Sequence, residues 1–349
     1  MLIIKEDDFL KIKKEIKSAG IDPEALTEKL KSIKKVIVVC GPTCTGKTRL
    51  AVHLAELFNT DIISIDSMQV YRGMDIGTDK FKSKDLKIKQ YMVDISNPDN
   101  PVTVVKFRNI CRRVIEDEFF KKKRIPLIAG GSGLYIRAVI DNLEFTAKTG
   151  VDDYGDNSVR EKIGVDIKKY GLEFIYKKLC DVDPVYAAKI GANDERRIIR
   201  ALEVFRITGI PFSLFQKRWS DRKSIYNVSM LGLIMEKKNL NECIETRVED
   251  MFSRGLVKEV KNLLARGYKN CYSLKQALGY KEVIEFLNGK ISLVDCRKEI
   301  IQNTKKLVKK QLTWFKADMR INWLRTDKYD NILNLMIDAI KIINEDCKK

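Results

Sequence analysis

A glycine-rich turn near the N-terminus carries the residues best placed to do chemistry. The apolar run Val36–Cys40 leads into residues 41–48, which read GPTCTGKT. In a segment of the form G-x-x-x-x-G-K-T, backbone N–H groups cradle phosphate oxygens, and the following helix adds the positive end of its dipole. Lys47 supplies a full positive charge, and the Thr48 hydroxyl suits Mg²⁺. The spacing predicts a P-loop that binds a diphosphate or polyphosphate; the alternative is an ordinary strand–turn–helix with two glycines.

A carboxylate follows the next apolar run along the chain. The run Asp61–Ile65 ends at Asp66, so Asp66 is expected at the same edge of a sheet as the phosphate loop. Three roles are open: Asp66 could hold Mg²⁺, accept a proton as a general base, or cap the next turn together with Ser67. The later run Ile125–Ala129 ends in glycines without an acid. This absence argues against an ordinary ATPase and favours the general base.

The elements that must position these residues are indicated by apolar runs that alternate with helical patterns. Strands are expected at 36–40, 61–65, 125–129 and 226–235, and helices at 47–58, 105–120 and after residue 133. Such alternation is typical of an α/β protein, and we predict a P-loop NTPase-like parallel sheet flanked by helices. Ligands bind at the carboxyl ends of such strands. The loops 41–48, 66–69 and 130–133 all fall there, so one crevice is expected.

The chain divides into four parts by its patterns. Residues 1–32 predict a helical N-terminal extension, with Asp22 as the N-cap of its second helix. Residues 33–144 form the first part of the core, residues 145–220 a helical insertion, and residues 221–349 the rest of the core with a basic helical C-terminal part.

Composition restricts the class of protein further. The 349 residues include 66 Lys and Arg against 48 Asp and Glu, which gives a net charge of +18. Basic residues cluster at 121–124, at 196–200 and at 305–310. Such clustering favours a nucleic-acid partner over a lysine-rich composition alone.

Other features indicate the compartment. No apolar run approaches the length needed to cross a bilayer, and the N-terminus has no secretory signal pattern. The eight cysteines form no C-x-x-C pair, which favours the reducing cytoplasm over a disulfide framework or a zinc site.

The segment Asp66–Thr78, DSMQVYRGMDIGT, together with the phosphate loop, closely resembles the tRNA dimethylallyltransferase (tRNA isopentenyltransferase) family. The resemblance runs in the family's order over nearly the whole chain after Ser32. It includes GGSGLYIRA (130–138), NDERRIIRALEVFRITG (193–209), RVEDMFSRGLVKEV (247–260), QALGYKE (276–282) and KKQLTWFK (309–316).

The resemblance implies a reaction and its partners. The family transfers a dimethylallyl group from dimethylallyl diphosphate to N6 of the adenosine just 3′ of the anticodon, position 37 of tRNA. It implies Mg²⁺ and no organic cofactor, a cytoplasmic enzyme without a membrane partner, and an insertion that contacts tRNA. We expect a monomer.

The resemblance also assigns residues. The catalytic set is Asp66, Lys47, Thr48 and Arg247, with Thr48 as the metal ligand. The diphosphate-binding set is Gly41, Pro42, Thr43, Cys44, Thr45, Gly46, Lys47 and Thr48. The tRNA-binding set is Asp66, Ser67, Met68, Gln69, Ser132, Arg160, Arg196, Arg197, Arg200, Gln276, Gly279, Tyr280 and Lys281.

Several of these residues have plainer interpretations. Arg247 could lie on a solvated helix face, and the arginines at 196–200 could form surface ion pairs with neighbouring acids. Trp314 and Phe315 are expected in the core rather than stacked on bases. His53, the only histidine, is expected on the surface of the helix after the phosphate loop.

The chain departs from the family's usual pattern at three places. The family's Gly-Thr-Ala-Lys-Pro is Gly77-Thr78-Asp79-Lys80-Phe81 here, and its Lys-Arg-Gln is Lys309-Lys310-Gln311. A segment that often contains histidine reads Gln90-Tyr91-Met92-Val93-Asp94. None of the three changes removes a residue assigned to chemistry.

Two other functions stay open at this point. An adenylate isopentenyltransferase shares these loops but acts on free AMP, ADP or ATP, and it would not need the insertion or the basic clusters. A P-loop RNA-binding NTPase would bind and hydrolyse ATP or GTP, and it would need an acid after the run Ile125–Ala129.

Overall fold

The structure, a computed structural model, describes residues 6–81, 88–143, 157–217 and 222–348. The chain forms two units: a core unit of Met1–Val102, Phe107–Ile140 and Tyr226–Lys349, and an inserted unit of Thr103–Lys106 and Asp141–Ile225. The predicted insertion, 145–220, falls inside the inserted unit. Its two predicted boundaries lie outside the described residues.

A six-stranded parallel sheet forms the centre of the core unit. Its strand order is β3-β2-β4-β1-β5-β6. The strands are β1 (Lys35–Cys40), β2 (Ile62–Ile65), β3 (Gln90–Tyr91), β4 (Leu127–Gly130), β5 (Asn227–Ile234) and β6 (Ile321–Arg325). The predicted fold class is confirmed, and four of the strands lie where the apolar runs indicated.

The two edge strands were not predicted. β3 has only two residues, both half-buried, so no apolar run marks it. β6 lies at the other edge, within the C-terminal part that was predicted to be helical, and that prediction is wrong there. Only two of the five β6 residues are buried, because an edge strand has one neighbour to pack against.

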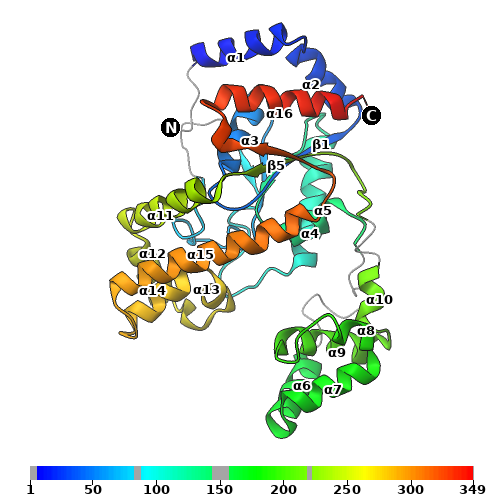
Figure 1. Cartoon of the computed structure of the whole chain (residues 1–349), viewed down its shortest axis with the longest axis vertical. Coiled ribbons are helices and arrows are strands. Elements are labelled where there is room, and N and C mark those ends of the chain that lie inside the picture. The colour runs from blue at the N-terminus through cyan, green and yellow to red at the C-terminus, as the bar shows by residue number, and fades with distance from the viewer. Residues whose placement is uncertain (1–5, 82–87, 144–156, 218–221, 349) are drawn as a thin grey trace. The chain divides into compact units, whose positions relative to one another are not determined.

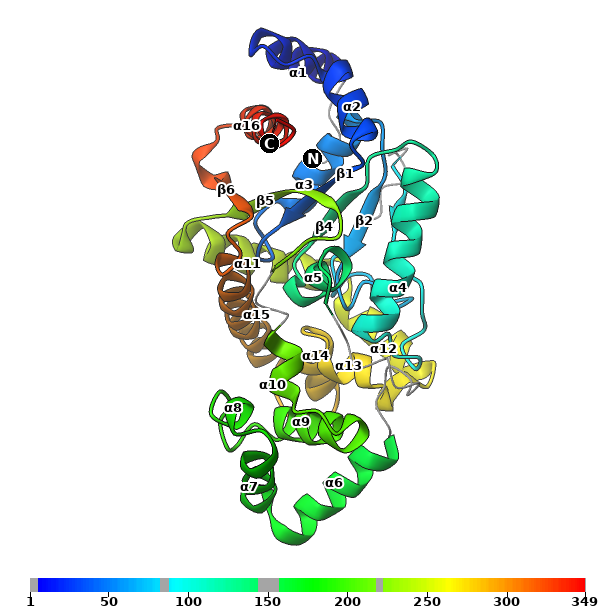
Figure 2. The ribbon, with the colours of Figure 1, turned by 90° about the vertical axis from the view of Figure 1, so that its right-hand side faces the viewer.

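Helices cover both faces of the sheet (Figure 1 and Figure 2). Alternate residues of β1 point to opposite faces: Val36 and Val38 belong to one apolar cluster, and Ile37 and Val39 to another. The second face is covered by α1 (Glu6–Ser18), α2 (Pro23–Ser32), α3 (Lys47–Leu57) and α16 (Ile332–Asp346).

The first face is covered by helices from the middle and the C-terminal part of the chain. They are α4 (Val104–Val114) with the π-helical turn η1 (Ile115–Phe120), α5 (Gly133–Ile140), α11 (Lys237–Ser253), α12 (Leu256–Ala265), α13 (Tyr272–Gln276), α14 (Tyr280–Leu287) and α15 (Leu293–Lys316). Short 3₁₀ turns, η3 (Tyr268–Asn270) and η4 (Thr326–Lys328), join some of the elements.

The inserted unit is helical and has its own core. Its helices are α6 (Asn157–Tyr170), α7 (Leu172–Val182), α8 (Pro184–Ala187), α9 (Glu195–Thr208) and α10 (Phe212–Lys217). Ile163, Ile175, Leu179 and Ile198 pack together there with no exposed surface. The helical nature of the insertion was predicted from its long amphipathic stretches.

The prediction for His53 is wrong. His53 lies in α3 and is 1% exposed. α3 contacts both the sheet and α16, and its residues from Leu50 to Ala55 are all buried, so this part of the helix has no side open to solvent. Burial lowers the pKa of His53 to about 4, so the ring is neutral at neutral pH.

Candidate active site

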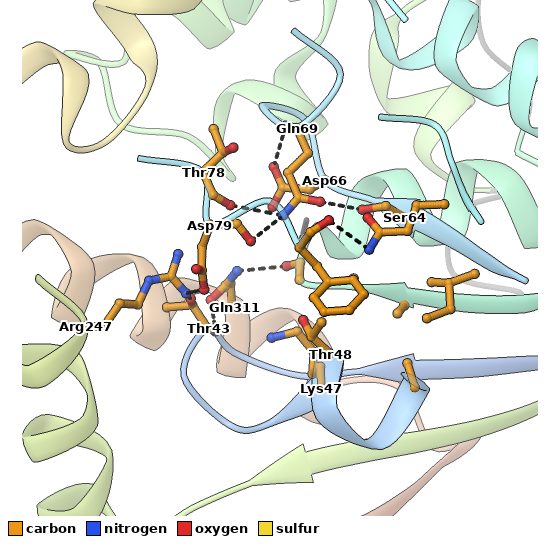
Figure 3. A pocket seen from close by; sticks show the side chains of 17 residues that line it. Thr43, Lys47, Thr48, Ser64, Asp66, Gln69, Thr78, Asp79, Arg247 and Gln311 are labelled. Carbon is orange, nitrogen blue, oxygen red and sulfur yellow. Dashed lines mark hydrogen bonds and ion pairs between the residues drawn. The ribbon is translucent and has the colours of Figure 1, made fainter. Parts of the chain in front are cut away.

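A cavity opens at the carboxyl ends of β1, β2 and β4 (Figure 3). The loops after these three strands line it, and α11 and α15 each contribute one side chain. The lining residues are Thr43, Lys47, Thr48, Ala51, Ile62, Ser64, Asp66, Gln69, Thr78, Asp79, Phe81, Gln90, Ala129, Gly130, Gly131, Arg247 and Gln311. The three loops that the sequence analysis placed at one crevice therefore do meet.

The phosphate loop has backbone conformations that require glycine. Gly41 has φ +134°, and a Cβ there would lie 2.4 Å from the carbonyl oxygen of Leu233 in β5. Gly46 has φ +84° and is the N-cap of α3. The Thr45 hydroxyl donates to the Pro42 carbonyl at 2.9 Å and is fully buried, so the side chain of Thr45 shapes the loop rather than facing a ligand.

Lys47 reaches into the cavity from the first turn of α3. Its Nζ donates to the carbonyl oxygen of Pro42 in the loop itself. Burial, and then the nearby positive charge of Arg247, lower the pKa of Lys47 to about 8. The ammonium therefore carries its charge at neutral pH and loses it a little above. Thr48 lines the cavity beside it.

Arg247 extends from α11 to the phosphate loop. Its Nη1 donates to Thr43 Oγ1 at 2.5 Å and lies 3.3 Å from Asp79 Oδ2, and its side chain is 25% exposed. The alternative that Arg247 lies on a solvated helix face is therefore wrong. The guanidinium instead adds a second positive charge to the cavity (Figure 3).

Gln311 is a site residue that the sequence analysis did not single out. From α15, its Oε1 accepts from the backbone N–H of Thr43 at 3.0 Å, and its Nε2 donates to the carbonyl of Gly131 at 3.0 Å. The amide thus joins the phosphate loop to the loop after β4. A Cβ at Gly131 would lie 2.6 Å from Nε2. The feature of the sequence that could have indicated this role is the polar Gln311 within the KKQLTWFK block.

Asp66 lies across the cavity from Lys47 and Thr48 (Figure 3). Its Oδ1 accepts from the backbone N–H groups of Met68 at 2.8 Å and Gln69 at 3.3 Å. Asp66 therefore caps the turn that follows, which was one of its three proposed roles. Both of these bonds use Oδ1, so Oδ2 is the oxygen left to contact a substrate.

Both ends of the Gln69 amide are held by protein groups. Its Oε1 accepts from the Ser64 hydroxyl at 2.6 Å, and its Nε2 donates to the Thr78 carbonyl at 3.0 Å. The orientation of this amide at the cavity is fixed by those two partners. Ser67 and Met68, two other predicted contacts to the base, are half-buried in the same turn and are absent from the cavity lining.

The loop 66–80 is held in place by a carboxylate from α12. Glu259 accepts from the backbone N–H groups of Asp75, Ile76 and Gly77, the shortest at 2.8 Å, and from the Tyr280 hydroxyl at 2.6 Å. A carboxylate with several N–H partners is a strong, directional anchor.

Tyr280 is part of that anchor and not a tRNA contact. It is fully buried, and its ring packs so closely on Gly77 that a Cβ there would lie 2.3 Å from a ring carbon. The assignment of its side chain to tRNA is therefore corrected to a structural one.

The other predicted tRNA contacts of this block differ in exposure. Gly279 is also buried, at the start of α14 with φ +90°, whereas Gln276 and Lys281 are exposed.

A buried lysine fixes the end of the same loop. Lys80 is 4% exposed, and its Nζ lies 2.9 Å from Asp75 Oδ1 and 2.6 Å from Asp94 Oδ1, and donates to the Tyr71 carbonyl. A buried ammonium needs such partners. The backbone on both sides of Asp79 is therefore held by specific contacts.

The basic residues predicted to contact tRNA lie on both units. In the inserted unit, Arg160 and Arg200 bind the buried carboxylate of Glu203 at 2.6 and 2.8 Å, and Arg197 pairs with Asp194 at 3.3 Å. The ion pairing weighed as the alternative is therefore present for Arg197 and Arg200. Arg196 is exposed, and in the core unit Ser132 is half-buried before α5.

The structure also places the basic cluster 121–124 and the two aromatic residues Trp314 and Phe315. In the cluster 121–124, Lys121, Lys122 and Arg124 are each paired with an acid. Phe315 is buried as predicted, but Trp314 is 41% exposed. The core prediction for Trp314 is wrong, because α15 packs one face on the core and carries Trp314 on another.

The chain is similar to known protein families. The family model described as IPP transferase matches residues 69–318, and the model described as isopentenyl transferase matches residues 34–95. This chain belongs to the IPP transferase family.

Two relatives named tRNA dimethylallyltransferase are about as long as the chain. The one from Thermoanaerobacter sp. (strain X514) is 40% identical over 312 residues, 88% of this chain and 97% of that protein. The one from Bacillus cereus (strain B4264) is 39% identical over 319 residues, 90% of this chain and 98% of that protein.

Solved structures agree with these matches. A tRNA isopentenylpyrophosphate transferase from Bacillus halodurans is 34% identical with a TM-score of 0.63, over 90% of this chain and 98% of that one. A eukaryotic dimethylallyltransferase acting on tRNA is 26% identical with a TM-score of 0.72, over 88% and 78%. The family member described here is therefore an enzyme, a prenyltransferase, as the sequence predicted.

No helix in the described part of the chain is long and apolar enough to cross a membrane.

Replacing Gly77 should destabilise the protein. The Cβ of a Gly77→Ala variant would meet the Tyr280 ring at 2.3 Å, and such overpacking costs about 1–3 kcal/mol of folding free energy. Thermal and denaturant unfolding would measure the loss. Gly133→Ala is the matched control, because its Cβ would find its nearest neighbour at 3.4 Å. Equal unfolding midpoints for the two variants would contradict this packing.

The depressed pKa of Lys47 gives a pH prediction. Bound pyrophosphate favours the charged lysine, so above pH 8 binding must take up a proton and the affinity should fall, by at most about tenfold per pH unit. A Lys47→Arg variant keeps its charge throughout. Calorimetric titration with inorganic pyrophosphate at pH 7, 8 and 9 should show a steeper loss for the natural protein. The ligand's own titration affects both proteins alike, so parallel pH curves would refute the lysine assignment.

Proposed function

We propose that this chain transfers the dimethylallyl group of dimethylallyl diphosphate to N6 of the adenosine 3′ of the anticodon, position 37, in tRNA. The product would be N6-isopentenyladenosine. One observation carries the proposal: a phosphate loop with two cations faces Asp66 across a single cavity. Family membership and the names of the relatives support it.

The cation side of the cavity suits the diphosphate of the donor. When the bond between C1 of the allyl group and the bridging oxygen breaks, negative charge builds on that oxygen. Lys47, Arg247 and the N–H groups of residues 41–48 would bind the diphosphate and stabilise that charge. Such a reaction transfers no phosphoryl group, so it needs no residue that positions an attacking water.

The donor set also fits Mg²⁺. This ion prefers oxygen ligands, keeps several waters, and is usually held by one or two protein groups together with substrate phosphates. Thr48 would hold the ion through its hydroxyl, which lies beside the loop in the same cavity. Bound Mg²⁺ would neutralise charge on the leaving diphosphate.

The same cavity has an apolar part for the five-carbon group. Ala51, Ile62, Phe81 and Ala129 line it together with the polar residues. An allylic group loses contact with water when it packs on such side chains, which is favourable. This lining supports a prenyl donor over ATP or GTP, whose ribose and base are polar.

Asp66 is the proposed base for the acceptor. The adenine must leave its stack so that its N6 amine can reach C1 of the allyl group. A bond forms between N6 and C1, the bond between C1 and oxygen breaks, and N6 gives up one proton. Oδ2 of Asp66 would accept it, since the two backbone N–H groups hold the carboxylate through Oδ1. Gln69 would orient the base.

The proposed tRNA contacts use residues of each unit that keep exposed atoms. Arg196, Gln276 and Lys281 are exposed, and Arg160 and Arg200 keep 40% and 36% of their side-chain surface accessible beside Glu203. Phosphate contacts by such residues would position the RNA without reading its sequence. A monomeric enzyme in the cytoplasm completes the proposal.

Incubation with labelled donor tests the function. Nucleoside mass spectrometry should find N6-isopentenyladenosine in an unmodified tRNA transcript treated with the protein, Mg²⁺ and dimethylallyl diphosphate. AMP and an ATP hydrolysis assay are the parallel reactions. Prenylation of AMP without tRNA, or ATP turnover stimulated by RNA in place of prenyl transfer, would refute the proposal in favour of one of the two alternatives.

An Asp66→Asn variant tests the base. Asparagine keeps an oxygen that can cap the turn but cannot take the proton, so kcat should fall by about 10²–10⁴-fold. Affinity for inorganic pyrophosphate should not fall, since the charge-bearing loop is untouched and the change removes a negative charge from the cavity. Asp99→Asn, at an exposed position outside the cavity, is the control. Near-normal kcat in the Asp66 variant would remove the general-base role.

A further inference from the structure

Asp79 introduces a negative charge where the diphosphate is expected to bind. It lines the cavity, and its Oδ2 lies 3.3 Å from Arg247 Nη1 while its Oδ1 lies 3.4 Å from Arg254 Nη1 (Figure 3). Neither the proposed base nor the phosphate loop needs this carboxylate.

The carboxylate occupies the guanidinium that the diphosphate would use. Arg247 contacts the Thr43 hydroxyl and Asp79. An incoming diphosphate must replace or share the contact with Asp79, and it must also approach a second negative charge. Attraction to Asp79 is therefore lost or reduced on binding, which lowers the net gain from Arg247.

The main chain at Asp79 is held in place beside the cavity. Its backbone has φ +52°, a left-handed conformation that aspartate and asparagine tolerate better than most residues. Gln69 holds the carbonyl of the preceding Thr78, and the following Lys80 is buried among its acidic partners. The main chain is thus fixed on both sides, and only the side-chain torsions can move the carboxylate.

We propose that Asp79 restrains Arg247 before the donor binds and sets the affinity for the diphosphate below what the cations alone would give. The carboxylate would compete with the donor for Arg247, and after transfer it would return to the guanidinium as pyrophosphate leaves. This inference rests on the proposed function, because it takes the cavity to be the diphosphate site.

A gain of affinity tests the inference. Calorimetric titration of the full-length protein with inorganic pyrophosphate should show that Asp79→Asn binds about three- to tenfold more tightly, as expected for loss of one partly exposed ion pair and one repulsive charge. Asparagine suits the left-handed backbone, so folding should be retained. The gain should shrink as salt is raised from about 50 mM to about 500 mM.

Asp250→Asn is the matched control. Asp250 pairs with Arg254 at 3.1 Å, as Asp79 does at 3.4 Å, but it lies outside the cavity lining. Its replacement removes the same charge nearby and should change pyrophosphate affinity by less than about twofold. An equal gain in both variants would mean that net charge, and not competition for Arg247, sets the affinity, and would overturn the inference.

Two further arms separate the possible failures. Unchanged or weaker binding by Asp79→Asn without Mg²⁺ would overturn the inference, and weakening seen only with Mg²⁺ would make Asp79 a metal ligand instead. Lys47→Ala should bind pyrophosphate at least about tenfold more weakly. If Lys47→Ala binds normally, the diphosphate site itself is wrong; if it loses binding while Asp79→Asn gains none, only the role of Asp79 fails.

Discussion

The register of three parallel strands is the constraint on which the site depends. β4 lies between β1 and β2, and Gly130 pairs with Cys40 on one side and with Ile65 on the other. The three strands therefore end at the same level, so the phosphate loop, Asp66 and Gly131 start side by side. A Cβ at Gly130 would lie 2.2 Å from the Ile65 carbonyl, so this close pairing itself requires glycine at the strand end.

Helices from the C-terminal part then fix loops that the sheet alone would leave loose. Glu259 binds three successive N–H groups of the loop 66–80, and Gln311 joins the phosphate loop to Gly131. These bonds link residues more than 170 positions apart. They explain why the resemblance to the family extends over the C-terminal blocks, although Glu259 does not line the cavity.

The sequence predicted what depends on local pattern and missed what depends on distant packing. The strands at 36–40 and 226–235 and the loop 41–48 are visible as an apolar run or a fixed spacing. The burial of His53 requires packing on more than one side of α3, and the close packing of Tyr280 requires Gly77. No period in the chain marks either of these contacts. The role of Gln311 likewise appears only when α15 is placed beside the phosphate loop.

The groups that would bind the diphosphate already form hydrogen bonds or ion pairs with other groups of the protein. The ammonium of Lys47 binds the Pro42 carbonyl, the N–H of Thr43 binds Gln311, and Arg247 binds the Thr43 hydroxyl. A diphosphate must exchange these bonds for its own, so its net affinity is smaller than the sum of its contacts. Before the donor arrives, these bonds within the protein offset part of the free-energy cost of removing the two cations from water. It also favours release of pyrophosphate once the allyl group has gone, since the displaced protein bonds can form again.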